Sequence, residues 1–113
     1  MTATKKTALV IAPGRGTYSK GELGSIARLH GLRFADVIAD FDAQRRARGQ
    51  PAVTELDGAD RFSVATHMRG DVAAPLIYTA TLLDYLSVDR NRYDIVAVAG
   101  NSMGWYSALT LCG

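Results

Sequence analysis

Residues 95–109 have the sequence IVAVAGNSMGWYSAL, and this stretch decides the fold predicted for the chain. A continuous apolar run, residues 95–99, leads into a Gly-x-Ser-x-Gly pentapeptide centred on Ser102, and a helix-compatible segment follows directly. The order strand, tight turn, helix is typical of a nucleophile elbow, where the backbone reverses at the serine and lifts its hydroxyl clear of its neighbours. The stretch therefore predicts a buried strand, an elbow at Ser102 and a helix.

The two glycines of the pentapeptide suit this interpretation. Gly100 and Gly104 have no Cβ, so the strand and the helix can approach each other closely around the turn. The start of the helix directs backbone N–H groups toward any negative charge that forms beside Ser102. Glycine and serine are also common loop residues, so the pentapeptide alone is equally compatible with an ordinary strand-to-helix turn.

Length and composition exclude several classes of protein. The chain has 113 residues, which we treat as one domain (residues 1–113) large enough to bury a core. Its 48% hydrophobic and 21% charged residues are typical of a soluble globular protein, and a net charge of +2 gives no indication of nucleic-acid or membrane binding. The single Cys112 excludes an internal disulfide and fits a reducing cytoplasm, the predicted location.

No cofactor or targeting signal is indicated. His30, His67 and Cys112 are far apart in the sequence and follow no metal-ligand spacing, so no metal site is predicted. The N-terminal apolar run, residues 8–12, is short for a signal-peptide core and far too short to span a bilayer.

Apolar periodicity predicts the other elements. In chain order we expect a strand, two helices, a polar connecting segment, a largely buried helix and a second strand, at residues 7–12, 23–30, 34–48, 50–69, 73–86 and 93–99. Two apolar strands separated by helices imply a parallel sheet that is covered by helices on both faces. The predicted fold class is α/β.

The two histidines and one basic cluster have ordinary structural explanations. His30 falls on the apolar stripe of its helix, which favours a half-buried histidine near the helix end. His67 falls in the connecting segment and is expected to be an exposed loop histidine. Arg45, Arg46 and Arg48 suit the C-terminus of a solvated helix, and a docking patch for an acidic partner is the alternative.

The loop after the first strand has the sequence PGRGTY, residues 13–18. It lacks the Gly-Lys-Ser/Thr ending of a phosphate-binding loop, because Ser19-Lys20-Gly21 stands there instead. A glycine-rich loop at this place can also present a free backbone N–H to an oxyanion, and this is the interpretation that we prefer.

Three features together resemble the malonyl-CoA:acyl carrier protein transacylases, the acyltransferases of fatty-acid and polyketide synthesis. They are the PGRG loop (residues 13–16), an apolar helix running through Pro75, and the sequence GNSMGWYSAL (residues 100–109). The resemblance spans almost the whole chain but only the N-terminal part of the family's domain. It implies that residues 1–113 form an incomplete acyltransferase domain.

The resemblance also implies a reaction and its residues. Ser102 would attack the malonyl thioester, CoA would leave, and the phosphopantetheine thiol of acyl carrier protein would then take the acyl group. The backbone amides of Met103 and Arg15 would form the oxyanion hole. The implied substrate is malonyl-CoA, the implied partner is acyl carrier protein, and no bound cofactor is implied. The residues that would support the elbow and the loop are Gly14, Gly16, Gly100, Asn101 and Gly104.

The sequence departs from the family's pattern at four positions. Arg15 and Ala74 stand where the family usually has glutamine, Asn101 replaces a histidine, and Trp105 replaces an acidic residue. A backbone donor at Arg15 survives such a change, and the histidine replaced by Asn101 is not the family's general base.

The family's catalytic histidine and the arginine that pairs with the malonyl carboxylate lie past Gly113. Neither His30 nor His67 matches them. Because a serine hydroxyl without a base is a poor nucleophile at neutral pH, we expect the 113-residue chain alone to have little or no transferase activity.

Two other functions remain open. The same elbow would serve a serine hydrolase or thioesterase, with water in place of the thiol. A non-catalytic α/β binding or scaffold domain with a degenerate elbow is the alternative outside enzymes, and Asn101 and Arg15 give it some support.

Overall fold

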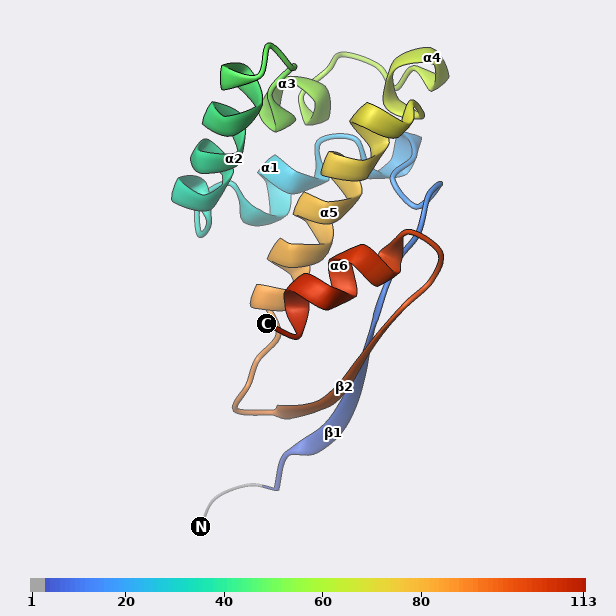
Figure 1. Ribbon diagram of the computed structural model, residues 1–113. Helices are drawn as coiled ribbons and strands as arrows, with labels where there is room; N and C mark the ends of the chain where they lie inside the picture. The colour runs from blue at the N-terminus through green and yellow to red at the C-terminus, as the bar shows by residue number, and fades with distance from the viewer. Residues whose placement is uncertain (1–3) are drawn as a thin grey trace.

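The computed structural model describes residues 4–113 and contains a two-stranded parallel sheet and six α-helices (Figure 1). The elements are β1 (Lys6–Ala12), a short 3-10 helix (Lys20–Glu22), α1 (Ser25–His30), α2 (Ala35–Ala47), α3 (Val53–Asp57), α4 (Val64–His67), α5 (Gly70–Leu86), β2 (Tyr93–Gly100) and α6 (Gly104–Leu111). The predicted mixture of helices with a parallel sheet is confirmed.

The parallel pairing of β1 with β2 brings two distant loops together. Lys6 lies opposite Tyr93 at one end of the ladder, and Ala12 lies opposite Gly100 at the other. The Asn101 N–H donates to the Ala12 carbonyl at 3.0 Å, which continues the pairing into the turn after β2. Because parallel strands end at the same edge of a sheet, the loop after β1 and the turn after β2 are neighbours.

The sheet is covered by a helix on one face only. In Figure 1, α6 lies over β1 and β2, and it also contacts α5. Leu9, Ile11 and Val96 are 58%, 64% and 62% exposed. The prediction of helices on both faces was therefore wrong, because α1 to α5 pack mainly around a core of their own.

That core is helical. Its buried members lie on α1, α2, α3 and α5, with Tyr18 added from the loop that follows β1: Tyr18, Ile26, Ile38, Val53, Leu56, Val72, Ala73, Leu76, Ile77 and Leu83. The prediction of a largely buried helix over residues 73–86 is confirmed by α5, although its last residue, Leu86, is 41% exposed.

The polar connecting segment contains two short helices, α3 and α4, which the sequence pattern did not predict. Asp42 of α2 accepts hydrogen bonds from the Thr54 N–H at 3.2 Å and the Thr54 hydroxyl at 2.7 Å. Val53 and Leu56 are buried against the core. Tertiary contacts rather than a local apolar period therefore hold α3 in place.

Within residues 4–113, no helix combines the length and apolar character that crossing a membrane requires. In the same range, no three histidine, cysteine, aspartate or glutamate side chains lie together as metal ligands would.

Candidate functional site

Ser102 lies in a strained turn between β2 and α6. Its φ is 55°, and it is the one non-glycine residue with positive φ in the part of the chain that the structure describes. The Gly104 N–H donates to the Asn101 carbonyl at 2.9 Å, and the Trp105 N–H donates to the Ser102 carbonyl at 3.2 Å. A side chain in the left-handed region costs about 1–3 kcal/mol, so the surrounding structure must enforce it. The result is an exposed serine where the backbone reverses.

The glycines on either side of this turn are required by close backbone contacts. A Cβ on Gly100 would overlap the backbone of Gly104 and Trp105. A Cβ on Gly104 would overlap the carbonyl of Ala12, the last residue of β1. The start of α6 is thus pressed against the ends of both strands.

The loop after β1 packs directly against the Ser102 turn. A Cβ built on Gly14 would lie 2.5 Å from the Asn101 carbonyl oxygen and 3.0 Å from Ser102 Cβ, so only glycine fits there without a shift. The structure therefore brings together residues 14 and 102, which are separated by almost the whole chain.

Two backbone donors near this contact are unused. Within residues 4–113, neither the Arg15 N–H nor the Met103 N–H donates a hydrogen bond to another group of the protein. The Arg15 side chain is held elsewhere, because its Nη2 donates to the Met68 carbonyl at 3.1 Å. Thr17 fixes the loop by donating its hydroxyl to the Gly14 carbonyl at 2.8 Å. Gly16 adopts a φ of +89°, which disfavours any other residue.

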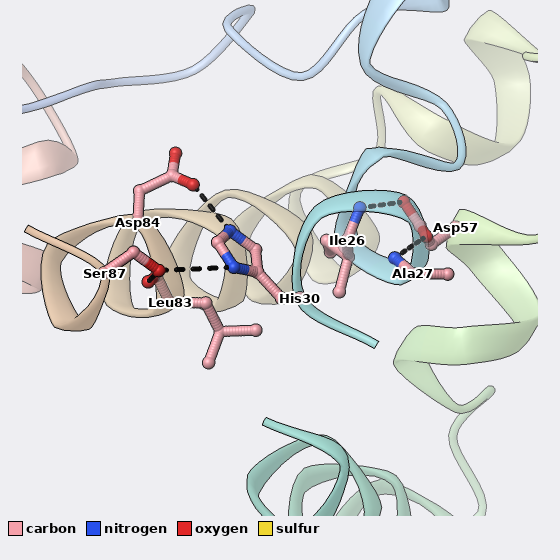
Figure 2. Close-up of polar contacts among 7 residues, drawn as sticks. All are labelled: Ile26, Ala27, His30, Asp57, Leu83, Asp84 and Ser87. Atoms are coloured by element: carbon pink, nitrogen blue, oxygen red, sulfur yellow. Dashed lines mark hydrogen bonds and ion pairs between the residues drawn. The ribbon is translucent and has the colours of Figure 1, made fainter. Parts of the chain in front are cut away.

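The far end of this loop is anchored by a buried carboxylate. Asp57 is 1% exposed and accepts hydrogen bonds from the Tyr18 hydroxyl at 2.5 Å, the Ile26 N–H at 3.3 Å and the Ala27 N–H at 3.1 Å; Figure 2 shows the last two. Burial and the neighbouring Asp57 carboxylate raise the pKa of Tyr18 well above its ordinary value. Asp57 thereby joins the start of α1, the end of α3 and the loop that leads back to Ser102.

His30 is more deeply buried than the sequence predicted, at 6% exposed, and its partners are on α5. Its Nε2 lies 2.7 Å from Asp84 Oδ1, and its Nδ1 lies 3.5 Å from Ser87 Oγ (Figure 2). The Ser87 hydroxyl donates to the Leu83 carbonyl at 2.7 Å, so its hydrogen points away from the imidazole. This serine–histidine–aspartate row lies at the C-terminal ends of α1 and α5, where helix carbonyl groups are exposed. His30 thereby links these two helix ends.

His67 is also buried, at 2% exposed, and the prediction of an exposed loop histidine was wrong. The Ser63 N–H donates to His67 Nδ1 at 3.0 Å, and Nε2 lies 2.9 Å from the Leu56 carbonyl, to which it donates. The Phe62 ring stacks on the imidazole, with 5.0 Å between the ring centroids. The composition of residues 50–69, which is typical of a loop, did not predict this arrangement. The hydrogen-bond partners of His67 are backbone groups, and these carry no side-chain pattern in the sequence.

Comparisons with protein-family models, curated proteins and solved structures found nothing that matches this chain. The functional interpretation therefore depends on the geometry. An exposed serine hydroxyl lies beside a loop and a turn that each carry an unused amide, and both histidines are engaged in the helical part of the molecule. The turn and the loop thus place an exposed hydroxyl beside two backbone N–H groups that have no partner within residues 4–113.

Proposed function

We propose that this chain carries the nucleophile and the oxyanion donors of an acyltransferase. The reaction is transfer of a malonyl group from CoA to the phosphopantetheine thiol of acyl carrier protein through an acyl-Ser102 intermediate. The contact of Gly14 with Asn101 and Ser102 supports the proposal most strongly. An ordinary strand-to-helix turn has no need of a second glycine-rich loop packed against its serine.

The proposed reaction has two steps, acylation of Ser102 and transfer of the acyl group to the carrier thiol. Ser102 Oγ loses its proton to a base and attacks the thioester carbonyl carbon, and the oxyanion formed accepts hydrogen bonds from the Met103 and Arg15 amides. Its collapse breaks the carbon–sulfur bond, and CoA leaves as the thiol with the proton that the base took from Ser102. The carrier thiol then gives its proton to the base and attacks the Ser102 ester. Collapse of this second oxyanion breaks the ester carbon–oxygen bond, and Ser102 Oγ takes the proton back from the base. Each oxyanion donor contributes on the order of 3 kcal/mol to lowering the barrier.

The missing part of this scheme is the base. His30 Nε2 is bonded to Asp84, and both nitrogens of His67 are bonded within the α3–α4 segment. With neither imidazole available, acylation of Ser102 by this chain alone is expected to be slow. The proposed reaction needs a base and a group that binds the malonyl carboxylate, and neither histidine is free to act as the base.

The test is mass spectrometry of the chain after prolonged incubation with malonyl-CoA. We expect a malonyl adduct on the peptide that contains Ser102, absent from Ser102→Ala. Ser63→Ala is the matched control, because its hydroxyl forms no capping hydrogen bond at α4 and the variant should be labelled like the wild type. Gly14→Ala should be labelled more slowly, since its Cβ would displace the loop from Ser102.

The same incubation separates the alternatives. Release of free malonate that depends on Ser102, without acylation of added acyl carrier protein, would favour a hydrolase. A folded wild-type chain that acquires no adduct, or one that is labelled equally in Ser102→Ala, would overturn the proposal and favour a non-catalytic domain.

A further inference from the structure

A cavity of about 360 Å³ lies between β1 and the helices α1 and α5. Val10 and Ile11 both line it, and their side chains point to opposite faces of the strand. The cavity therefore lies along the edge of β1 that has no neighbouring strand within residues 4–113. Neither Ser102 nor Met103 lines it, so it is separate from the serine turn.

Most of the wall of this cavity is apolar. Its apolar lining includes Ile11 of β1, Leu29 of α1 and Ile77 of α5. Leu29 and Ile11 are each 64% exposed, so the cavity is open to solvent on this side. The volume lies at the lower end of the range of small-molecule sites, which are mostly apolar with a few polar groups.

The titratable groups of the cavity include two carboxylates, those of Glu22 and Asp84, together with His30, which contacts Asp84. No lysine or arginine lines the cavity in the part of the chain that the structure describes. Asp84 uses Oδ1 for His30, which leaves Oδ2 available. Glu22 uses Oε2 for the Ser19 N–H and hydroxyl, which leaves Oε1 available, and these hydrogen bonds lower the pKa of Glu22. Each carboxylate is thus fixed on one side and open on the other.

Thr81 provides an independent indication that a partner is absent. It lines the same cavity and is only 7% exposed. Within residues 4–113, its hydroxyl oxygen is the one buried side-chain polar atom without a hydrogen-bond partner. Buried hydroxyl groups are nearly always hydrogen-bonded, so the free Thr81 hydroxyl is unusual.

We propose that this cavity binds a small protonated amine with an apolar body. The ammonium group would be held by the open oxygen of Asp84, Glu22 would add a second negative charge to the wall, and the body would cover Ile11, Leu29 and Ile77. The carboxylates of the cavity would repel phosphate and carboxylate groups. The cavity is therefore not suited to malonyl-CoA, which carries both. A free amine fits better than the lysine of a partner protein, whose narrow chain of four methylene groups would leave most of the apolar wall uncovered.

The test uses three probes of similar shape: phenylethylammonium, phenylethanol and phenylpropionate. In an NMR chemical-shift titration, the amine should perturb Leu29, Thr81 and Asp84. It should bind about tenfold more tightly than the alcohol, and the carboxylate should bind most weakly. Equal affinities for the amine and the alcohol, or no binding of any probe, would overturn the proposal.

Variants of the carboxylates separate charge from shape. Asp84→Asn and Glu22→Gln each keep an oxygen that can accept the existing hydrogen bonds, so the fold should persist. Each should weaken amine binding about fivefold and leave alcohol binding unchanged. Asp36→Asn, on the exposed side of α2, is the matched control and should bind all probes like the wild type. Amine binding that survives both carboxylate changes would contradict the proposed ion pairing.

Three further measurements test the occupant and the place of the site. Ala80→Phe should fill the cavity and block every probe, with circular dichroism as the check on folding. A blocked lysine, acetylated at its α-amino group, should bind more weakly than phenylethylammonium; tighter binding would identify a partner's lysine as the occupant and overturn the assignment. Ser102→Ala should leave amine binding unchanged. The test of amine binding is therefore independent of the proposed acyl transfer.

Discussion

The molecule has two regions that are built differently. The helical region, Tyr18 with α1 to α5, supplies the whole of the buried apolar core described above. The sheet region, β1, β2 and α6, leaves large apolar side chains in solvent, including Ile11 at 64%, Tyr106 at 76% and Leu109 at 70% exposed. The candidate serine lies in the sheet region. Stability and the proposed chemistry are therefore carried by different parts of one chain.

The polar groups show the same difference. In the helical region Asp57 accepts three hydrogen bonds, and both nitrogens of His67 are engaged. In the sheet region the amides of Arg15 and Met103 donate to no group within residues 4–113, and Ser102 is held at a positive φ. Unused donors and strained backbone are typical of places where a ligand binds.

The largest difference between the regions should appear when a leucine is truncated in each. Leu76 of α5 is fully buried, and Leu76→Ala should lower the free energy of unfolding by about 3 kcal/mol through lost burial and a residual cavity. Leu9 of β1 is 58% exposed, and Leu9→Ala should cost less than about 1 kcal/mol. Urea denaturation followed by circular dichroism measures both. Similar costs for the two variants would mean that the exposed face of the sheet is covered in solution.

A smaller effect is expected where the sheet region is most tightly packed. A Cβ on Gly104 would overlap the Ala12 carbonyl, so Gly104→Ala should cost about 2 kcal/mol and displace α6 from the strands. Gly70→Ala is the matched control, because a Cβ there meets no atom within 4 Å and alanine favours the helix. Urea denaturation gives the stability, and NMR shifts of the residues around Ser102 locate the change. A neutral Gly104→Ala variant would show that α6 does not need this close approach.

The sequence predicted the elements whose apolar pattern is local. The apolar period and the positions of the glycines predicted the strands, α2, α5 and α6. The parallel pairing of the strands explains why the loop at Gly14 contacts the turn at Ser102. The same apolar strands suggested a sheet covered on both faces, because a sequence pattern shows what can be buried but not whether a helix is there to cover it. Leu9 and Ile11 are the residues that revealed this error.

Other features depend on contacts between distant residues, and the local sequence pattern did not predict them. The α3 helix is held by Asp42, and His67 is held by backbone groups of Leu56 and Ser63. The cavity was not predicted at all, because its walls come from β1, α1 and α5. One signal was present: Asp84 is the single charged residue between Asp71 and the end of α5, and an isolated charge on an apolar helix often marks a polar site.

The link between the two regions should respond to alkaline pH. Tyr18 extends from the loop after β1 into the helical core, where burial and Asp57 raise its pKa above the ordinary value of 10.0. Above about pH 10 the unfolded chain loses this proton while the folded protein keeps it, so the folded state binds more protons. The contribution of Tyr18 is thus fully present below pH 10, and stability should then fall by about 1.4 kcal/mol per pH unit.

Tyr18→Phe isolates this contribution from the other titrating groups. The variant should be less stable at neutral pH, because Asp57 loses one donor, but its stability should decline less steeply between pH 10 and pH 11 than that of the wild type. Urea denaturation at a series of pH values measures both slopes. Equal slopes would show that the Tyr18 hydroxyl ionises as readily in the folded protein as in the unfolded chain, and that the loop beside Ser102 is not anchored through Asp57.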